Sequence, residues 1–494
     1  MKLSMRTELR LFTEPQLEQL LRKALHVLRG TPFRIQGTEE FFDYLTAYGC
    51  EVNGELVRFP QAVIDKVMAR CAEEKRNARA LFLENGGKNA EAATEVSVFT
   101  HGQALHICDL ETNKLRPATE TDLAQWCHVV DALGITSRAH PTFIPTDVPV
   151  TAADFHAFAT IILNSRRPHV VSVYGARMLP FFIEACKIAK GSLEAVKEES
   201  VFAAKAWVTS PFMLDRVNVD IAMDARRLLG APLTFGHMPV AGASTPVSVA
   251  GALVQNTAES LALSAIRLAV DNLPQPILGS AAIMDMKHGF PRQIGPDIFL
   301  HRLAGYEMDD YLYRGYTSPR YDAMGWSGAG AATVSTQSVC EKAMGIAFGA
   351  ALGARKFGVG SLAFSDVGSP VHLVIDQELV GFVQNLVREV SMDDDHVGMD
   401  TILETAPTGG RFLETDHTTR FFQEECWLPK LLDYRAFMAW AKDPADMIAA
   451  AQVKARDLYA TARNQCPLSA EQRTAIHQLL KEADAVAREG ASTT

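Results

Sequence analysis

The chain has 494 residues and a formal net charge of −10, and 48% of its residues are hydrophobic while 21% are charged. This composition excludes a disordered chain and fits one large core with additions or two to three domains. The acidic balance disfavours nonspecific binding to nucleic acid or to anionic membranes. Eight cysteines are scattered without a CxxC pair, so we expect neither a zinc site nor a disulfide framework.

The first predicted elements are helices. Thr13 is a cap residue, with Pro in the first turn and Gln three residues on, and the helix it starts ends at Gly30. A second helix is predicted over residues 39–48 and a third from Pro60. We therefore expect a helical N-terminal region over residues 1–95. No apolar signal core and no apolar run of spanning length are visible, so a cytoplasmic protein is expected.

A rhythm of strand followed by helix comes next. Residues 96–110 predict a hairpin or a pair of strands, which could supply an eighth strand to those that follow. Further strands are predicted at 137–144, 169–174, 201–208, 233–236, 277–282, 323–326 and 357–364. The helices between and after them are predicted within 151–162, 179–189, 212–230, 249–271, 296–313, 337–353 and 376–390. Such crossovers make the strands parallel.

Seven strand–helix pairs fit two architectures, an eight-stranded barrel or an open doubly wound sheet. An open sheet that binds nucleotides favours a GxGxxG turn after a strand, and neither that turn nor a GxxxxGK[ST] loop stands there. We therefore predict an α/β fold, a TIM (β/α)8 barrel over residues 96–395 with N-terminal and C-terminal helical additions. The C-terminal appendage covers residues 396–494.

In such a barrel, the residues just beyond each strand meet at one mouth. Aromatic rings recur there while charged groups are few. Such a set of side chains suits a quaternary ammonium, because this cation cannot donate a hydrogen bond and is stabilised by the faces of aromatic rings instead. Each ring face stabilises such a cation by about 0.5–2 kcal/mol. The same rings would alternatively cap the layers of the barrel core. The candidate substrate-binding residues are Tyr174, Arg177, Trp207, His237, Trp326, Phe364 and Asp366.

Several of these residues have alternative roles. His237 is an acid/base group, a metal ligand or a hydrogen-bonded structural residue, and Asp285 and His288 would join it in a metal site although their spacing is not diagnostic. Asp366 either faces a cation or caps the following helix. Arg177 or Arg320 would recognise a carboxylate or form a surface ion pair. Small-residue loops at 241–244 and 325–332 suggest that a large flat object, a macrocyclic cofactor or a substrate protein, approaches the mouth.

Some stretches resemble a known family, the trimethylamine methyltransferases, and in particular its members without pyrrolysine. These stretches are residues 238–253 with Asn256, Ala258 and Glu259, then 283–286, then Gln337 with 341–343, and 407–413 with His417 and Thr418. The similarity extends from the N-terminal helices to about Asp443. These are loop and structural motifs, so they indicate the family more than a particular substrate.

The resemblance implies a TIM barrel that removes a methyl group from a methylated amine and passes it to the Co(I) form of a corrinoid on a separate small protein. In the trimethylamine enzymes pyrrolysine precedes the helix that here starts near Gln337, whereas residues 330–336 of this chain are small and uncharged. That departure favours a quaternary amine similar to glycine betaine. An acidic residue and a Lys expected in this loop are missing, so no catalytic residue is assigned.

The resemblance also implies partners. These are the cognate corrinoid protein and a small methylated amine, and no bound metal of the chain's own is expected. The net charge and the lack of a long apolar run predict neither a nucleic-acid nor a membrane partner, and a homo-oligomer is compatible with the composition. The loop residues expected to face the corrinoid are Met238, Gly242, Ser244, Gly328, Gly330 and Gln337. Two other functions stay open: a metal-dependent lyase or aldolase that uses His237, Asp285 and His288, and a scaffold that binds a small cation without turnover.

Overall fold

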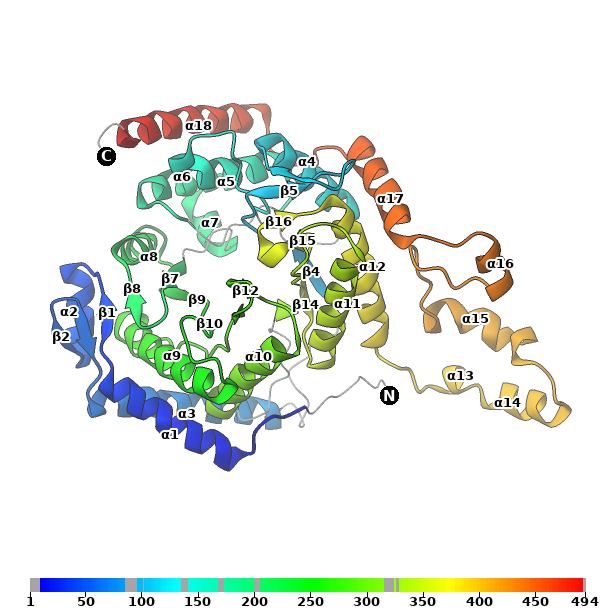
Figure 1. Ribbon diagram of the computed structural model, residues 1–494, viewed down its shortest axis with the longest axis horizontal. Helices are drawn as coiled ribbons and strands as arrows, with labels where there is room; N and C mark the ends of the chain where they lie inside the picture. Colours follow the sequence, from blue (N-terminus) through cyan, green and yellow to red (C-terminus); the bar gives the residue numbers. More distant parts are fainter. Residues whose placement is uncertain are drawn as a thin grey trace.

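Short central strands are surrounded by helices in the computed structural model (Figure 1). The structure describes residues 9–84, 96–100, 102–134, 141–167, 173–199, 205–314, 324–325 and 328–491. They form a mixed α/β fold, which confirms the predicted class. Within these ranges, no helix combines the length and the apolar character that a membrane span requires.

The longer helices are α1 (Glu14–Gly30), α2 (Glu39–Tyr48), α3 (Gln61–Glu84), α4 (Glu120–Leu133), α5 (Ala153–Asn164), α6 (Leu179–Lys190), α7 (Leu193–Glu199), α8 (Arg216–Leu229), α9 (Val249–Asp271), α10 (Pro296–Asp309), α11 (Thr336–Ala351) and α12 (Pro370–Leu386). Beyond them lie α13 (Asp394–Val397), α14 (Met399–Thr405), α15 (Asp416–Glu425), α16 (Phe437–Lys442), α17 (Met447–Thr461) and α18 (Ala470–Ala491). The central strands are β4 (Ser97–Thr100), β7 (Lys205–Val208), β9 (Thr234–His237), β11 (Ala282–Asp285), β13 (Met324–Gly325) and β14 (Lys356–Val359). Among the outer strands, β1 (Phe33–Ile35), β2 (Glu51–Asn53), β3 (Leu56–Arg58) and β8 (Met213–Leu214) form one sheet, and β5 (His106–Cys108), β6 (Leu115–Pro117), β15 (Ser361–Leu362) and β16 (Val367–Gly368) form another. Finally, β10 (Val240–Ala241) and β12 (Phe290–Arg292) flank β11.

The predicted N-terminal helices are confirmed as α1, α2 and α3. At the start of α1, the Gln16 side chain accepts a hydrogen bond from the Thr13 backbone N–H at 2.9 Å. The buried face of α1, which includes Leu17 and Leu21, belongs to one hydrophobic cluster with α2, α3 and the central helix α9. This cluster also includes Phe235 of β9, so the N-terminal helices help to fix the helix and the strand that adjoin the candidate site.

Every described pairing between two of the central strands is parallel. β7 pairs with β9, β13 pairs with β14, and β14 pairs with β4, so the first and the last strand of the alternation are neighbours. Beyond β4, Ala104 forms a parallel bridge to Phe143. The described strands fall into five separate sheets, so a closed barrel stays a prediction. Residues 137–140, 169–172 and 201–204 of three predicted strands, and residues 323 and 326 of a fourth, lie outside the described residues.

Three predicted boundaries were wrong. The strand predicted at 277–282 is β11, at Ala282–Asp285, because the backbone N–H of Ile277 donates to the Asp309 carboxylate at 2.8 Å instead of to a neighbouring strand. The strand predicted at 357–364 ends at Val359, where Gly360 follows with a φ of +80°. The helix predicted from 376 starts earlier as α12, because the Ser369 side chain caps it and Pro370 occupies its first turn.

Residues 96–110 contain two strands rather than a hairpin. β4 pairs with β14, whereas β5 pairs with β6 and β16. The alternative of a pair of strands over residues 96–110 is therefore confirmed.

Two glycines allow α10 to pack closely against the segment before β11. A Cβ on Gly305 would overlap the backbone of Gly279, and a Cβ on Gly279 would lie 2.5 Å from the carbonyl oxygen of His301. We expect Gly305→Ala to lower the free energy of unfolding by about 3 kcal/mol, because the backbone of Gly279 cannot move away from the new methyl group as a flexible side chain could. Urea denaturation measures this change. Gly30→Ala is the control, since a Cβ at Gly30 meets nothing within 4 Å, and equal stability of the two variants would contradict the expectation.

Candidate functional site

An aromatic ring lies across the paired strands β7 and β9. Val208 and Phe235 belong to the hydrophobic cluster beneath α9, and because side chains alternate along a strand, Trp207 and Gly236 are on the opposite face. Trp207 and Gly236 are register partners, and a Cβ on Gly236 would lie 2.5 Å from Cε3 of the Trp207 ring. Glycine at this position therefore lets the half-buried indole lie directly over the neighbouring strand.

Tyr174 is tied to the segment that follows β4. Its phenol donates a hydrogen bond to the side-chain oxygen of Gln103, and its backbone N–H donates to Asp154 Oδ2 at 2.9 Å. Burial, assisted by the nearby Asp154 carboxylate, raises the pKa of Tyr174 to about 12. The phenol is therefore neutral near pH 7 and keeps its ring face and its O–H group. About half of the residue is exposed.

His237 is part of a buried cluster with Ser210 and Glu259. Its Nε2 lies 2.5 Å from Glu259 Oε2 and 2.9 Å from Ser210 Oγ, and the Ser210 hydroxyl lies 2.8 Å from the same carboxylate oxygen. The other oxygen of Glu259 accepts a hydrogen bond from the Phe212 backbone N–H at 2.8 Å. The cluster therefore joins the loop after β7, the end of β9 and the middle of α9.

This geometry differs from a nucleophilic relay. In such a relay the hydroxyl and the carboxylate use different nitrogens of the imidazole, whereas Ser210 and Glu259 both contact Nε2 of His237. Nδ1 of His237 is buried without a hydrogen-bond partner, and the side chains of His237 and Glu259 are fully buried. The contacts support the structural alternative for His237, in which it holds the loop after β7.

The contacts of Glu259 were missed from the sequence, where this residue was named only as part of the motif that resembles the family. A signal was available, because Glu259 lies in the middle of a long helix rich in Ala and Leu, and a carboxylate that such a helix buries needs a partner.

The small-residue loop before α11 is held by a carboxylate from that helix. Glu341 Oε2 accepts hydrogen bonds from the backbone N–H groups of Gly330, at 2.8 Å, and Ala331, at 3.2 Å. Its other oxygen accepts from the Gln337 side chain at 2.9 Å. The loop itself contains no acidic residue, but Glu341 supplies a negative charge to its backbone from outside.

A strained turn lies against the same loop. Ala363, Phe364 and Ser365 have φ values of 45°, 60° and 74°, and this left-handed conformation costs roughly 1–2 kcal/mol for each such residue. The N–H of Ala363 donates to the carbonyl of Ala331 at 3.0 Å, and the N–H of Phe364 donates to that of Ala329 at 3.1 Å. Backbone strain of this kind is concentrated at functional sites, so this turn is a candidate part of the functional site.

The strained turn also sets the positions of Phe364 and Asp366. The Phe364 ring meets that of Phe290 edge to face, with the centroids 6.5 Å apart. Partial burial raises the pKa of Asp366 against the influence of His106. Asp366 does not cap α12, because Ser369 does, so the helix-cap alternative for Asp366 was wrong.

A second buried polar cluster underlies this region. Lys342 of α11 lies 2.9 Å from Asp376 of α12, whose other oxygen lies 3.1 Å from His372 Nδ1. His372 Nε2 lies 2.7 Å from the Ser338 hydroxyl, and the Gly360 backbone N–H donates to Asp376 at 2.8 Å. The side chains of Lys342, His372 and Asp376 are fully buried. The cluster therefore fixes α11, α12 and the end of β14 to one another.

The remaining predicted site residues are distributed around these clusters. The small-residue loop before α11, which Glu341 holds and which we call the Glu341 loop, has four of them in or around it: Gly328, Gly330, Gln337 and Phe364. Met238 is exposed just after β9, Gly242 and Ser244 lie in the following turn, and Arg177 is exposed next to α6. Trp326 and Arg320 lie outside the described residues.

The predicted metal ligands do not form a site with His237. His288 Nδ1 lies 3.0 Å from Asp285 Oδ2 at the exposed end of β11, whereas the His237 side chain is fully buried against Glu259. Within the described part of the chain, no group of three or more His, Cys, Asp and Glu residues could hold a metal ion.

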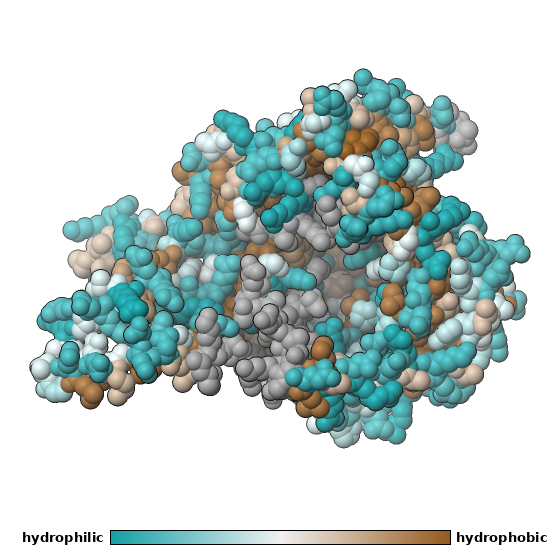
Figure 2. All heavy atoms as spheres, turned by 180° about the vertical axis from the view of Figure 1, so that it is seen from behind, coloured by the Kyte–Doolittle hydropathy of each residue, from teal (hydrophilic) through white to brown (hydrophobic). Residues whose placement is uncertain are grey.

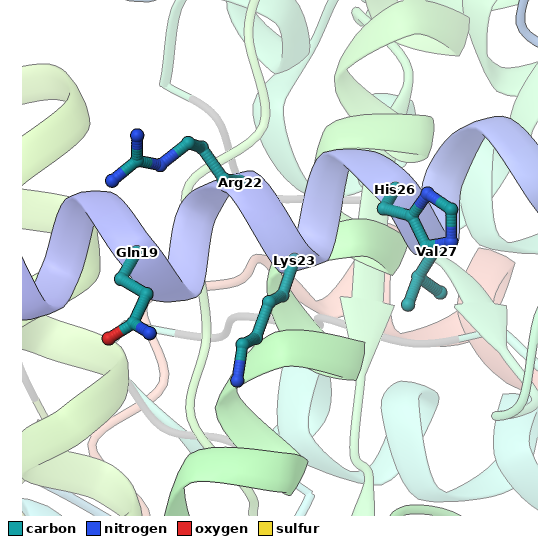
Figure 3. Close-up of a pocket in the computed structure, with 5 residues that line it drawn as sticks. All are labelled: Gln19, Arg22, Lys23, His26 and Val27. Atoms are coloured by element: carbon teal, nitrogen blue, oxygen red, sulfur yellow. The ribbon is translucent and has the colours of Figure 1, made fainter.

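A shallow, open pocket of about 490 Å³ lies on the surface of α1, and Figure 3 shows the side chains that line it. Its lining residues are Gln19, Arg22, Lys23, His26 and Val27. All five come from one helix, and three of them carry basic groups. Its lining has no Phe, Tyr or Trp ring, and α1 lies on the outside of the fold (Figure 1), so it does not fit the predicted cation site.

The Glu341 contacts lead to a testable expectation. Glu341→Ala removes the acceptor of two backbone N–H groups, so the amides of Gly330 and Ala331 should exchange with solvent roughly 10-fold faster or more. Hydrogen–deuterium exchange of the loop measures this effect. The control is Gln337→Ala, which removes only the contact to the other carboxylate oxygen. Unchanged exchange in Glu341→Ala would contradict this role.

Comparison with known proteins identifies the family. A family model described as trimethylamine methyltransferase (MTTB) matches residues 3–485. Similar proteins include the trimethylamine methyltransferase MttB of Desulfitobacterium hafniense strain DSM 10664 / DCB-2, which is 22% identical over 82% of this chain and 80% of its own length. The glycine betaine methyltransferase of D. hafniense strain Y51 is 24% identical over 88% of both chains, and the trimethylamine methyltransferase MttB of Methanosarcina thermophila is 24% identical over 91% of this chain and 93% of its own. The chain belongs to the trimethylamine methyltransferase family, a family of methyltransferases.

Proposed function

We propose that the protein transfers a methyl group from a quaternary or otherwise methylated amine, similar to glycine betaine, to the Co(I) corrinoid of a separate corrinoid protein. Family membership supports the class of reaction, and the relatives include enzymes named for trimethylamine and for glycine betaine. The single observation that carries the choice of a cationic substrate is the Trp207 indole, which lies across Gly236 on the side of the strands turned away from α9.

The proposed frame for this reaction is a closed (β/α)8 barrel. Three parallel pairings support it: β7 with β9, β13 with β14, and β14 with β4. The pairing of β14 with β4 brings the last strand back to the first, as closure requires. The bridge from Ala104 to Phe143 continues the ring on the far side of β4. Figure 1 shows the helices arranged around these strands, as they are in a barrel.

The proposed substrate site uses ring faces rather than acid/base pairs. Trp207, Tyr174 and Phe364 would surround the cation, with Trp326 as a further candidate, and Arg177 would meet a carboxylate. A quaternary nitrogen leaves as a neutral amine, so its departure needs no general acid. Tyr174 fits this scheme, because its phenol is neutral near pH 7 and presents a ring without introducing an acid that is active there.

The residues around the Glu341 loop fit the approach of a corrinoid. Gly328 and Gly330 have no side chains, so only backbone is presented at these two positions, and a Cβ on either would lie 3.3–3.4 Å from a neighbouring side chain. Met238 adds an exposed, flexible apolar side chain after β9. When delivered by its carrier protein, the corrinoid supplies the Co(I) nucleophile. The chain's own task is to desolvate the cation and to orient one methyl group.

The proposal is tested with purified protein, a free Co(I) corrinoid and a panel of methylated amines. We expect conversion of the corrinoid, followed by absorbance, with at least one betaine and little with trimethylamine. Conversion with none of the panel contradicts the proposed reaction, and binding of a betaine without conversion, measured by calorimetry, assigns the cation-binding scaffold instead. The metal-dependent lyase loses its support, because His237 is buried with Glu259 while His288 and Asp285 pair at an exposed site.

A further inference from the structure

Glu259 is a charged residue in a place where charges are rare. On the face that Figure 2 shows, hydrophilic side chains are widespread at the surface, whereas the side chain of Glu259 is fully buried in the middle of α9. Burying a carboxylate costs free energy unless an opposite charge or several hydrogen bonds compensate for it. The groups around this carboxylate therefore decide what the residue can do.

The described partners of Glu259 are all groups that can donate a hydrogen bond without a charge. They are the Phe212 backbone N–H at 2.8 Å, the Ser210 hydroxyl at 2.8 Å and Nε2 of His237 at 2.5 Å. Asp376 differs, because its side chain is also fully buried but the Lys342 ammonium lies 2.9 Å away and offsets its charge. Among the described contacts of Glu259, only His237 could supply such a counter-charge.

The hydrogen bonds of His237 indicate that its imidazole is neutral. An imidazolium has a proton on both ring nitrogens, and each N–H group then needs an acceptor. Nδ1 of His237 is buried without a hydrogen-bond partner, so a proton on Nδ1 would be an unsatisfied buried donor. The single ring proton therefore belongs on Nε2, which donates it to Glu259 Oε2. The cluster of Ser210, His237 and Glu259 then contains a negative charge that none of its own groups offsets.

This charge is held at the carboxyl ends of β7 and β9. His237 directly follows Gly236 in β9, and Gly236 is the register partner of Trp207 in β7. Ser210 belongs to the turn that follows β7. Glu259 reaches these groups from α9, whereas the indole lies on the opposite face of the strands. The carboxylate and the Trp207 ring are therefore neighbours across the backbone of the two strands.

We propose that Glu259 provides the negative charge that selects a cationic substrate over the Trp207 ring. The inference rests on the proposed function, because it assumes that the methylated amine binds at this ring. A quaternary ammonium cannot donate a hydrogen bond, so a charge favours it through space and does not need to touch it. A carboxylate behind the strands attracts the cation without placing a second nucleophile against its methyl groups. Unit charges about 10 Å apart, at an effective dielectric constant of about 20, change an affinity by roughly 15-fold.

The test compares two ligands that differ in one charge. Glycine betaine and 3,3-dimethylbutyrate have the same shape and the same carboxylate, but carbon replaces the quaternary nitrogen in the second. Isothermal titration calorimetry without a corrinoid measures the dissociation constant of each. We expect the wild type to prefer the betaine by roughly 10-fold or more. In Glu259→Gln, which removes the charge and keeps the size, the preference should fall by roughly 10-fold through weaker binding of the betaine alone.

Two further variants separate the charge from the hydrogen bonds. Ser210→Ala removes one donor of the cluster but keeps the carboxylate, so the preference for the betaine should remain. Glu378→Gln is the matched control, because Glu378 is a buried carboxylate of α12 that accepts hydrogen bonds from the backbone of residues 430–432, and it should leave both dissociation constants unchanged. Equal weakening of both ligands in Glu259→Gln assigns the carboxylate a structural role only and overturns the proposal.

A measurement on the wild type makes the test independent of how the variants fold. Nitrogen NMR of the protein labelled in its histidines, with His237→Gln to identify the signal, should show His237 as a neutral imidazole protonated on Nε2. An imidazolium would offset the charge of Glu259 and overturn the proposal. So would a wild type that binds both ligands alike or neither of them, even if it transfers methyl groups. A wild type that prefers the betaine but transfers no methyl group contradicts only the proposed function.

Discussion

Trp207→Leu is expected to reduce kcat/KM for the quaternary amine by roughly 30-fold or more, whereas Trp207→Phe should retain most of the activity. Leucine fills much of the space over Gly236 but has no ring quadrupole, and a desolvated cation–π contact is worth about 2 kcal/mol or more. Phenylalanine keeps a ring face for the cation. Initial rates of corrinoid conversion against substrate concentration measure kcat and KM for each variant.

The two Trp207 variants separate binding from packing. If the indole serves only as a filler over β9, leucine and phenylalanine should have similar activities and similar stabilities, which would contradict the proposed cation site. A change in KM larger than that in kcat is expected from Trp207→Leu, because a quaternary ammonium has its full charge before the transfer begins. Thermal denaturation of both variants is the control for folding.

Sequence patterns predicted the helices well, because their signals are local. Thr13 capping α1 and the alternation of apolar strands with amphipathic helices depend on nearby residues alone. The boundaries at Ile277 and Pro370 were wrong for a different reason. Ile277 bonds to Asp309, thirty-two residues away, and the early start of α12 depends on the Ser369 cap, which the amphipathic pattern from 376 onward does not include.

The candidate site was predictable only in part. The aromatic residue Trp207 and the glycine-rich loop at 328–330 stand out in the sequence because their chemistry is visible in the residue itself. The partners of His237 and of the loop do not stand out, because Glu259 and Glu341 lie on helices and come close only through tertiary packing. A loop with no charge in its own sequence therefore acquires one from α11.

The largest loss of stability is expected from Asp376→Ala. This change leaves the Lys342 ammonium buried without its carboxylate, and an uncompensated buried charge lowers the free energy of unfolding by about 3–5 kcal/mol. The double variant Lys342→Met/Asp376→Leu removes both charges and should be destabilised by less than the single variant. Urea denaturation of the single and the double variants measures the difference. Equal or greater destabilisation of the double variant would show that the ion pair is not what stabilises this cluster.

Acid pH should reveal the same interaction in the unmutated protein. Burial alone would raise the pKa of Asp376, but the Lys342 ammonium and His372 outweigh it and hold the pKa below its ordinary value of 3.8. Because the unfolded chain binds this proton more readily, the carboxylate stabilises the fold fully above about pH 5, and its contribution is lost as the pH falls through the folded-state pKa. Between about pH 5 and pH 3, the free energy of unfolding of the wild type should therefore decrease more steeply than that of Asp376→Asn. Urea denaturation of both proteins at several pH values measures this difference. If the two free energies fell in parallel, the pKa of Asp376 would not be depressed in the folded protein.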